Sequence, residues 1–296
     1  MYADKLHEDF QYMFENKMYN QMTVYIEACE SGSMFENILE DNMNIYAVTA
    51  ANSTESSWGT YCSPNDKVNG KKIKSCLGDL FSVNWLEDSD KADMAAESLQ
   101  QQYSAVRDLT TKSEVLQWGE VDFTAEPIGE FQSGGIPAEK TVSESLWNQI
   151  KHKTPKMIKD MFEINAESQR KALSAVSSRD IDLHFWYNIA VDEPTEENLQ
   201  ALQDYITYRK KVDDTVEAIF GTEFMSNLEG TKNLPTDFEC YRTMINKFQE
   251  QCFEADGYNM KYYKAFVAHC EFAKNFPEGE ELVQKTLDKM DEVCQH

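Results

Sequence analysis

The sequence predicts an α/β domain with a mainly parallel sheet, followed by an all-α domain. In the first half of the chain, short β-branched and aromatic runs alternate with helical patterns, which is typical of βαβ units. After a flexible joint at residues 129–135, no segment reads as a strand and long stretches have helical periodicity. The 296 residues are enough for two domains, each with its own core.

The predicted α/β region begins with a helix. Residues 1–22 form an amphipathic pattern whose apolar positions recur on one face: Phe10, Met13, Phe14 and Met18. Residues 22–26 and 45–49 are short apolar runs whose length suits buried strands. The segment between them is expected to be helical over residues 34–39.

Cys29 follows the first predicted strand directly. In a parallel sheet, reactive groups lie just beyond the carboxyl ends of the strands, and Cys29 has that position. The next residues, Glu30-Ser31-Gly32-Ser33, predict a tight turn.

The remaining elements follow from the same patterns. Residues 52–78 are rich in loop formers, residues 91–109 predict a helix and residues 115–123 a strand. The predicted helices of the second half cover residues 141–187, 196–220, 236–254, 257–275 and 278–294. No internal repeat is visible.

Charge and hydropathy exclude two classes of partner. The net charge of −24 argues against nucleic acid, because phosphate binding needs clustered Lys and Arg. No apolar run approaches the roughly 18 residues that cross a bilayer, so we expect no membrane partner. Met1–Phe10 is polar and charged and does not resemble a secretory signal.

The chain has seven cysteines, at positions 29, 62, 76, 240, 252, 270 and 294. An odd number leaves one thiol free in an oxidised protein, so we expect three disulfides and one reactive thiol. The alternative is seven reduced, mostly buried cysteines in a cytosolic protein. There is no CxxC pair and the five histidines are scattered, so we expect no metal site and no cofactor.

Cys29 is the candidate nucleophile. A catalytic thiol needs a partner that removes its proton, usually His, and donors for the developing oxyanion. The tight turn after Cys29 is expected to leave backbone N–H groups free for that purpose. The alternative reading of such a cysteine is a small buried hydrophobic residue.

Several ordered blocks resemble the legumains, the asparaginyl endopeptidases. They are VYIEACESGSM at 24–34, IYAVTAAN at 45–52, ESSWGTYC at 55–62, CLGDLFSVNW at 76–85 and EDSD at 87–90. The blocks at 55–62 and 76–85 look most like plant-type members. The resemblance implies a caspase-like fold for residues 1–135, a linker or activation peptide at 136–195 and a helical prodomain at 196–296.

The resemblance implies a role for each matching residue. Cys29 is the expected nucleophile, Glu27 and Asp79 line the S1 pocket, and Ser56 and Ser57 form its wall. Carboxylates accept from the NH₂ of an Asn side chain but repel an Asp side chain unless protons intervene, so Asn is preferred and Asp is tolerated in acid. Without the resemblance, Glu27 and Asp79 read as solvated surface acids.

Disulfide pairing also follows from the resemblance. It implies Cys62–Cys76 in the first half and Cys240–Cys270 with Cys252–Cys294 in the prodomain, where sequence alone leaves three pairings open. The expected activation cleavage follows Asn188, with Asn198 and Asn165 as further candidates. Asn52 begins a glycosylation sequon.

The family prodomain covers the active site until acid releases it. Because both halves of this chain are acidic, a local latch is expected, in which Arg170, Arg179 or Arg209 contacts carboxylates such as Glu27 or Asp79. The alternative is that these arginines face solvent.

The family's general-base His, in a His-Gly pair upstream, has no counterpart here, and His7 stands in a helical context without a following Gly. We therefore expect a sequence that starts inside a longer gene product, with three strands missing, a poorly protected sheet edge at Val24–Ile26 and no activity by itself. The implied function is an asparagine-specific cysteine endopeptidase zymogen of the lysosome or vacuole, reached through the secretory pathway. Its partners are Asn-containing protein and peptide substrates and its own prodomain. The alternative is a non-catalytic relative that acts as a binding or inhibitory protein.

Overall fold

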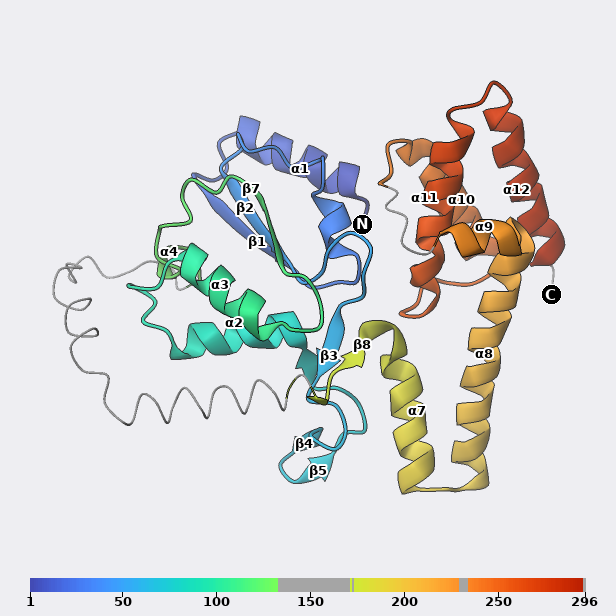
Figure 1. The fold of residues 1–296 in the computed structure, drawn as a ribbon, viewed down its shortest axis with the longest axis horizontal. Helices are drawn as coiled ribbons and strands as arrows, with labels where there is room; N and C mark the ends of the chain where they lie inside the picture. Colours follow the sequence, from blue (N-terminus) through green and yellow to red (C-terminus); the bar gives the residue numbers. More distant parts are fainter. Residues whose placement is uncertain (133–170, 172, 229–233, 295–296) are drawn as a thin grey trace. The chain divides into compact units, whose positions relative to one another are not determined.

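The computed structural model describes residues 1–132, 171, 173–228 and 234–294. These residues fall into two compact units, Met1–Ser177 and Ser178–His296, and each is described by itself (Figure 1). The predicted helix at 141–187 lies outside the described residues as far as residue 170.

The first unit is built on a three-stranded sheet. β1 (Met22–Ile26) pairs in parallel with the fully buried β2 (Ile45–Thr49), and β7 (Leu116–Gly119) pairs antiparallel with the other edge of β2. Val24 lies opposite Ala47 and Tyr25 opposite Val48. Both predicted strands at 22–26 and 45–49 are therefore confirmed, and the predicted strand at 115–123 is shorter.

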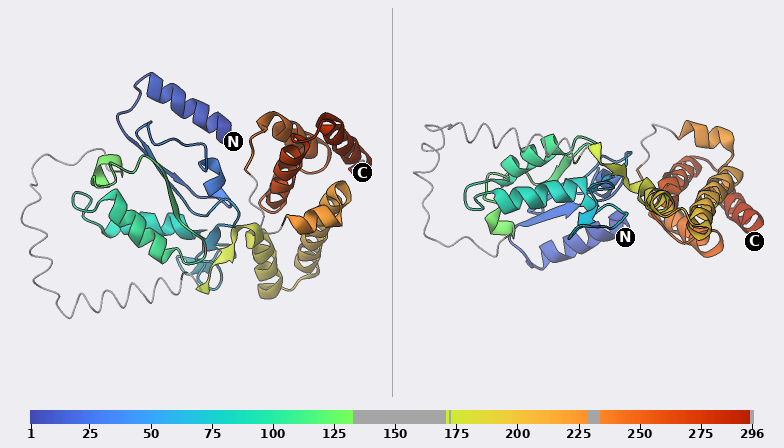
Figure 2. Two further views of the ribbon diagram at one scale, coloured as in Figure 1. Left: turned by 45° about the horizontal axis from the view of Figure 1, so that its top comes forward. Right: turned by 90° about the horizontal axis from the view of Figure 1, so that it is seen from below.

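Helices cover both faces of this sheet (Figure 2). Side chains alternate along β2, so Ile45 and Ala47 join the cluster with Phe10 of α1 (Ala3–Glu15). Tyr46 and Val48 face the opposite way and pack with residues of α2 (Leu80–Lys91) and α3 (Leu99–Leu109). The core of the unit is thus two layers on a central strand, and it fixes the carboxyl ends of β1 and β2.

Three predicted helix boundaries were wrong. α1 ends at Glu15 because Lys17 takes a left-handed φ of 52°, which leaves Met18 outside the helix and 61 % exposed. Residues 34–39 are not an α-helix; a 3-10 helix, Ser31–Met34, ends at the first of them. The predicted helix at 91–109 is divided, because α2 ends at Lys91 and a Ser98–Gln101 capping box starts α3.

A second small sheet lies beside the carboxyl end of β1. β3 (Trp58–Thr60) is its central strand, paired antiparallel with β6 (Gly78–Asp79) and with β8 (Val176–Ser177). β8 contradicts the expectation that no strand follows residue 135. A disulfide joins Cys62 to Cys76, and beyond it β4 (Lys67–Val68) and β5 (Lys71–Lys72) form a hairpin.

The second unit is helical. Its elements are η2 (Ser178–Asp180), α7 (Ile181–Asp192), α8 (Glu196–Phe220), α9 (Thr222–Asn227), α10 (Phe238–Gln251), η3 (Asn259–Tyr262), α11 (Tyr263–Ala273) and α12 (Gly279–Val293). The predicted helix at 196–220 matches α8 at both ends, whereas α9 was not predicted. Val216, Met244, Phe248, Phe266 and Met290 form the core of the unit. A short α4 (Gly129–Gln132) belongs to the first unit.

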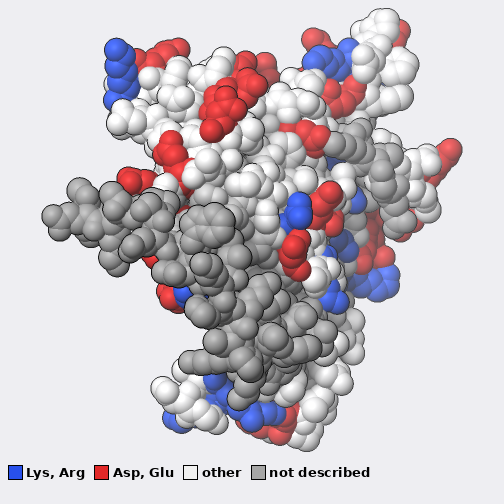
Figure 3. Space-filling view, turned by 60° about the vertical axis from the view of Figure 1, so that its left-hand side comes forward, with Lys and Arg blue, Asp and Glu red and all other residues white. Residues whose placement is uncertain are grey.

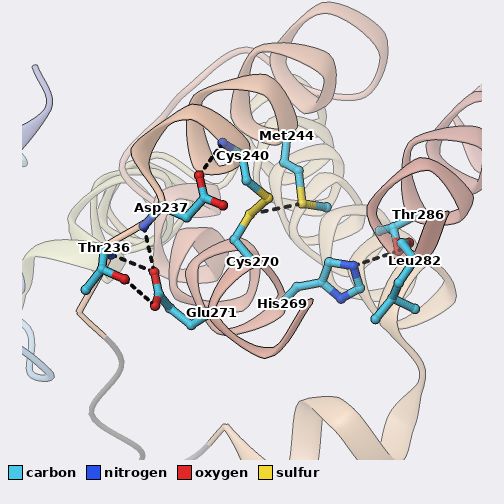
Figure 4. Close-up of a disulfide and its surroundings, with 9 residues drawn as sticks. All are labelled: Thr236, Asp237, Cys240, Met244, His269, Cys270, Glu271, Leu282 and Thr286. Atoms are coloured by element: carbon cyan, nitrogen blue, oxygen red, sulfur yellow. Dashed lines mark hydrogen bonds between the residues drawn. A yellow bond between two sulfur atoms is a disulfide. The ribbon is translucent and has the colours of Figure 1, made fainter. Parts of the chain in front are cut away.

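Two disulfides tie this helical core together. Cys240–Cys270 joins α10 to α11, and Cys252–Cys294 joins the ends of α10 and α12, which are the pairs that the resemblance implies. Figure 4 shows the first of them against Met244. In the same view, Glu271 accepts hydrogen bonds from the N–H groups of Thr236 and Asp237, so it holds the chain that leads into α10.

Candidate functional site

The turn after β1 is fixed by the loop that follows β2. Ile26 O accepts a hydrogen bond from Ala50 N–H at 3.0 Å, and the buried Ser31 hydroxyl binds both Ala51 N–H and Ala51 O. Gly32 is needed here, since a Cβ at this position would lie 3.0 Å from the backbone of Asn52 and Ser53. Glu30 takes a left-handed φ of 53°. This tight turn places Cys29 at its start.

Cys29 is the one free cysteine, because the other six form the three disulfides. Its Sγ lies 3.3 Å from Ser56 Oγ and 3.6 Å from Ser57 Oγ. The Ser56 hydroxyl also lies 2.8 Å from Ser57 O, to which it can donate, and either the thiol or the hydroxyl can be the donor in the contact between Cys29 and Ser56. The structure therefore brings Cys29, Ser56 and Ser57 together.

Glu27 and Asp79 are both half-buried; Glu27 lies two residues before Cys29, and the charge of Asp79 acts on Glu27. Asp79 lies opposite Gly59 on the ladder between β3 and β6. Glu27 Oε2 accepts a hydrogen bond from Ser82 N–H at 2.8 Å, whereas Glu27 Oε1 is buried without a hydrogen-bond partner among the described residues. The reading of Glu27 and Asp79 as solvated surface acids does not fit this environment.

Burial changes the protonation of both acids. Burial is the main cause that raises the pKa of Glu27 to about 7. The hydrogen bond from Ser82 N–H lowers this pKa, and the charge of Asp79 adds to the increase. Burial also raises the pKa of Asp79. The pair therefore gains a proton in mild acid, where ordinary carboxyl groups are still ionised.

In the described part of the chain, Cys29 has no histidine among its hydrogen-bond partners. His7 lies in α1, His184 contacts Asn188, and the buried His269 contacts Thr286. His152 and His296 lie outside the described residues. Within the described ranges, no group of three or more His, Cys, Asp or Glu side chains has the arrangement of a metal site.

The prediction of free backbone donors after Cys29 was largely wrong. Glu30 N–H donates to Glu55 O at 2.7 Å, Gly32 N–H to Ala51 O and Ser33 N–H to Glu30 O. These hydrogen bonds shape the turn, so the three N–H groups are not free to bind an oxyanion. The N–H groups of Cys29 and Ser31 make no hydrogen bond within the described ranges and are the donors of this turn left for an oxyanion.

A segment that sequence reasoning missed lies along β3. Ser177 of β8 lies opposite Trp58, and its hydroxyl is 2.9 Å from Ser56 Oγ. Farther upstream, Lys171 O accepts a hydrogen bond from Thr60 Oγ1, and its buried ammonium pairs with Glu87 at 2.6 Å. A two-residue strand has no periodicity, so its sequence carries no usable signal.

The predicted processing residues lie in structured surroundings. Asn188 is inside α7, and its side-chain amide lies 3.0 Å from His184 Nδ1. Asn198 is in the first turn of α8, where its side chain donates to Glu193 O. Asn165 lies outside the described residues. The Asn52 amide donates to Glu114 at 3.1 Å, so a glycan there would displace this contact.

Arg179 and Arg209, which were expected to form a latch, have partners within the helical unit. Arg209 pairs with Asp180 at 2.7 Å and lies over the Tyr258 ring, whereas Arg179 donates to Gly257 O at 3.0 Å. Both arginines thus bind groups of the helical unit. The alternative reading, that they simply face solvent, does not hold, and the latch to the first unit stays a prediction. Arg170 lies outside the described residues.

None of the helices in the described ranges is both long and apolar enough to cross a bilayer.

Fold and site together define an α/β unit with a free thiol after a parallel strand, followed by a disulfide-bonded helical unit. The family model described as Peptidase C13 family matches residues 1–134, and the model described as Legumain, prodomain matches residues 200–286. The chain belongs to the peptidase C13, or legumain, family.

Relatives support this placement along most of the chain. It is 32% identical over 311 residues to the vacuolar-processing enzyme delta-isozyme of Arabidopsis thaliana, covering 99% of this chain and 61% of the relative. It is 32% identical over 290 residues to a vacuolar-processing enzyme of Vicia sativa, covering 91% of this chain and 55% of the relative. It is 31% identical over 291 residues to the vacuolar-processing enzyme beta-isozyme 1 of Oryza sativa subsp. indica, covering 91% of this chain and 54% of the relative. The chain spans about half the length of the curated relatives it matches.

Proposed function

We propose that the first unit is the nucleophile-bearing part of a cysteine endopeptidase that cuts after asparagine. The observation that carries this proposal is the placement of Cys29 within 3.3 Å of Ser56, near two half-buried carboxyl groups with raised pKa values. Attack by the sulfur on the peptide carbonyl would give a thioester and release the amine, and water would then release the acid.

The carboxyl groups account for the choice of side chain. An Asn amide offers NH₂ donors, and Glu27 Oε1 is a buried acceptor without a partner among the described residues. Above about pH 7, an Asp side chain meets ionised Glu27 and Asp79 and is repelled. As the pH falls below about 7, Glu27 takes up a proton and becomes a donor for a carboxylate. The pocket therefore accepts Asn over a wide pH range and Asp only in acid.

Turnover needs a general base that these 296 residues do not provide in the family's His-Gly form. The thiol contacts Ser56 and has no histidine among its hydrogen-bond partners in the described ranges. The 296-residue chain by itself is therefore inactive in peptide hydrolysis, and activity requires a base from outside it.

A segment of the chain itself also lies along the site. β8 occupies the outer edge of β3, and the Ser177 hydroxyl reaches Ser56, which contacts Cys29. The helical unit serves as a prodomain, with cleavage after Asn188 as the release step. Because Asn188 is inside α7, that cleavage requires local unwinding of the helix.

The relatives are named vacuolar-processing enzymes, and we place this protein in a vacuolar or lysosomal compartment reached by the secretory route. Three disulfides suit the oxidising conditions of that route. Acid conditions there would also protonate Glu27.

A second candidate is a non-catalytic binding or inhibitory protein. The missing histidine partner of Cys29 in the described ranges favours it, and it would use the same pocket without turnover.

Peptide binding and turnover, measured together, test the proposal. Fluorescence anisotropy at pH 5 should show that an Asn peptide binds about tenfold more tightly than its Ala counterpart, and Asp79→Asn should reduce this preference. Turnover should stay at the level of the Cys29→Ala control until a base is added, for example imidazole. Equal binding of the two peptides would contradict the asparagine pocket, and an absence of imidazole-dependent cleavage would favour the binding protein.

A further inference from the structure

The loop closed by Cys62 and Cys76 has a charge opposite to that of the whole chain. It carries four lysines, at positions 67, 71, 72 and 74, and one acid, Asp66, in a protein of net charge −24. Asp66 is fully buried, whereas both strands of the hairpin are exposed. Figure 3 shows basic side chains gathered at the lower end of the molecule, where Figure 1 places β4 and β5.

The hairpin holds these lysines in fixed places. Asn69 and Gly70 have φ values of 50° and 79°, as a type I′ turn requires, and Lys67 lies directly opposite Lys72. Buried Asp66 accepts a hydrogen bond from Ile73 N–H at its carbonyl and from Lys74 N–H at its carboxylate. Like charges directly opposite one another repel, so an anionic group is favoured beside the exposed Lys67.

Residues 58–79 form an antiparallel ribbon that carries part of the candidate site, and the hairpin is its outer end. β3 and β6 form its inner part, with Ser57 at the start of β3 and Asp79 in β6. Leu77 N–H donates to Thr60 O and the disulfide follows, which continues the ribbon from the pocket to the lysines.

β8 shows which way a peptide runs along this ribbon. Ser177 lies opposite Trp58 and Val176 opposite Gly59, and Lys171 O meets Thr60 farther along. The partner of β3 therefore advances toward Cys62 as it is followed toward its own N-terminus. At about 3.3 Å per residue, positions about four to eight residues upstream of the one beside Ser56 come within reach of the hairpin.

We propose that the β4–β5 hairpin is a subsite for acidic side chains upstream of the cleaved residue, so that the preferred ligands are acidic peptides ending in the asparagine that enters the pocket. This inference rests on the proposed function for the orientation of the peptide. Lys67 and Lys71 form no ion pair among the described residues, and they extend from opposite faces of the short ladder, so they can flank an acidic peptide that passes the hairpin.

The test uses the full 296-residue chain and four fluorescent peptides. The peptides combine an acidic or a neutral upstream run with Asn or Ala at the pocket position. Lys67→Gln with Lys71→Gln removes two charges from the exposed hairpin. The matched control, Lys5→Gln with Lys17→Gln, removes two exposed charges at α1, on the far side of the same unit (Figures 1 and 2). Circular dichroism verifies that both variants fold.

The wild type should bind the acidic Asn peptide about three- to tenfold more tightly than the neutral one, and about 0.5 M salt should abolish the difference. The hairpin variant should lose this advantage, and the α1 variant should keep it. An equal affinity for the acidic and neutral Asn peptides would overturn the hairpin subsite and leave the asparagine pocket intact. An acidic advantage combined with equal affinities for the Asn and Ala peptides would keep the hairpin subsite and count against the pocket. If neither Asn peptide binds, both are wrong.

Discussion

Glu27 Oε2 accepts a hydrogen bond from the backbone N–H of Ser82, 2.8 Å away, in the first turn of α2. Asp79, the residue before α2, makes no side-chain cap of its own, so Glu27 satisfies a helix donor from another element. The candidate pocket and the start of α2 are thus built on one carboxyl group, and a change at Glu27 affects both specificity and stability.

The first prediction concerns the pH dependence of stability. The pKa of Glu27 is raised to about 7, so the folded state holds this proton more tightly than the unfolded state. Its contribution is complete below the unfolded pKa, near 4.5, and is lost as the pH rises through about 7. Glu27→Gln should raise the midpoint of thermal unfolding at pH 8 by about 3–6 °C and change it little at pH 4. An equal change at both pH values would contradict the raised pKa.

The second prediction concerns Lys171, which anchors the segment that leads to β8. The Lys171 side chain is 7 % exposed and pairs with Glu87. Lys91 also pairs with Glu87, at 3.3 Å, but the Lys91 side chain is 59 % exposed. Lys171→Gln should lower the free energy of unfolding by about 1–3 kcal/mol, because it leaves Glu87 without its buried partner. Lys91→Gln is the matched control and should cost less than about 0.5 kcal/mol. Urea unfolding measures both, and equal costs would show that Lys171 is not an anchor.

The third prediction concerns His269 in the helical unit. It packs against Phe220 of α8 and Phe224 of α9, and its Nε2 lies 3.1 Å from Thr286 Oγ1 of α12 (Figure 4). These neighbours are uncharged, and burial lowers the pKa of His269, against a hydrogen bond with the Leu282 backbone. The unfolded state therefore binds the proton more tightly.

Stability from His269 is complete above the ordinary pKa of about 6.5 and is lost as the pH falls below it. His269→Gln should flatten the loss of helical stability between pH 7 and pH 5 in urea unfolding followed by circular dichroism. His184→Gln is the control and should keep the wild-type pH dependence. A His269→Gln curve as steep as the wild type's would contradict this account.

Sequence reasoning found the elements whose signals are local and repeated. β1 and β2 were predicted within their observed bounds because they are compact β-branched runs, and α8 because its 25 residues sustain one pattern. The boundary of α1 was missed because Lys17 leaves the helix through a left-handed φ, which the apolar spacing up to Met18 conceals. β8 was missed because pairing with a distant strand, and not its own sequence, makes it a strand.

The candidate site was also predicted only in part. The resemblance grouped Cys29, Glu27, Ser56, Ser57 and Asp79, and the structure brings these residues together. The N–H groups of Glu30, Gly32 and Ser33 were expected to be free, but acceptors from the loop after β2 and from the turn itself take them. Such contacts depend on which segments the fold places next to the turn, which no local pattern encodes.

The central claim is that Cys29 faces a pocket that selects asparagine, and covalent labelling of its thiol tests this without a general base. The 296-residue chain is treated at pH 5.5 with two thiol-reactive peptides that differ only in Asn or Ala before the electrophilic carbon, and intact mass is followed over time. The account predicts that the Asn peptide modifies one thiol at least about tenfold faster, that Cys29→Ala is not modified, and that Asp79→Asn reduces the preference. Equal labelling rates for the two peptides would contradict it.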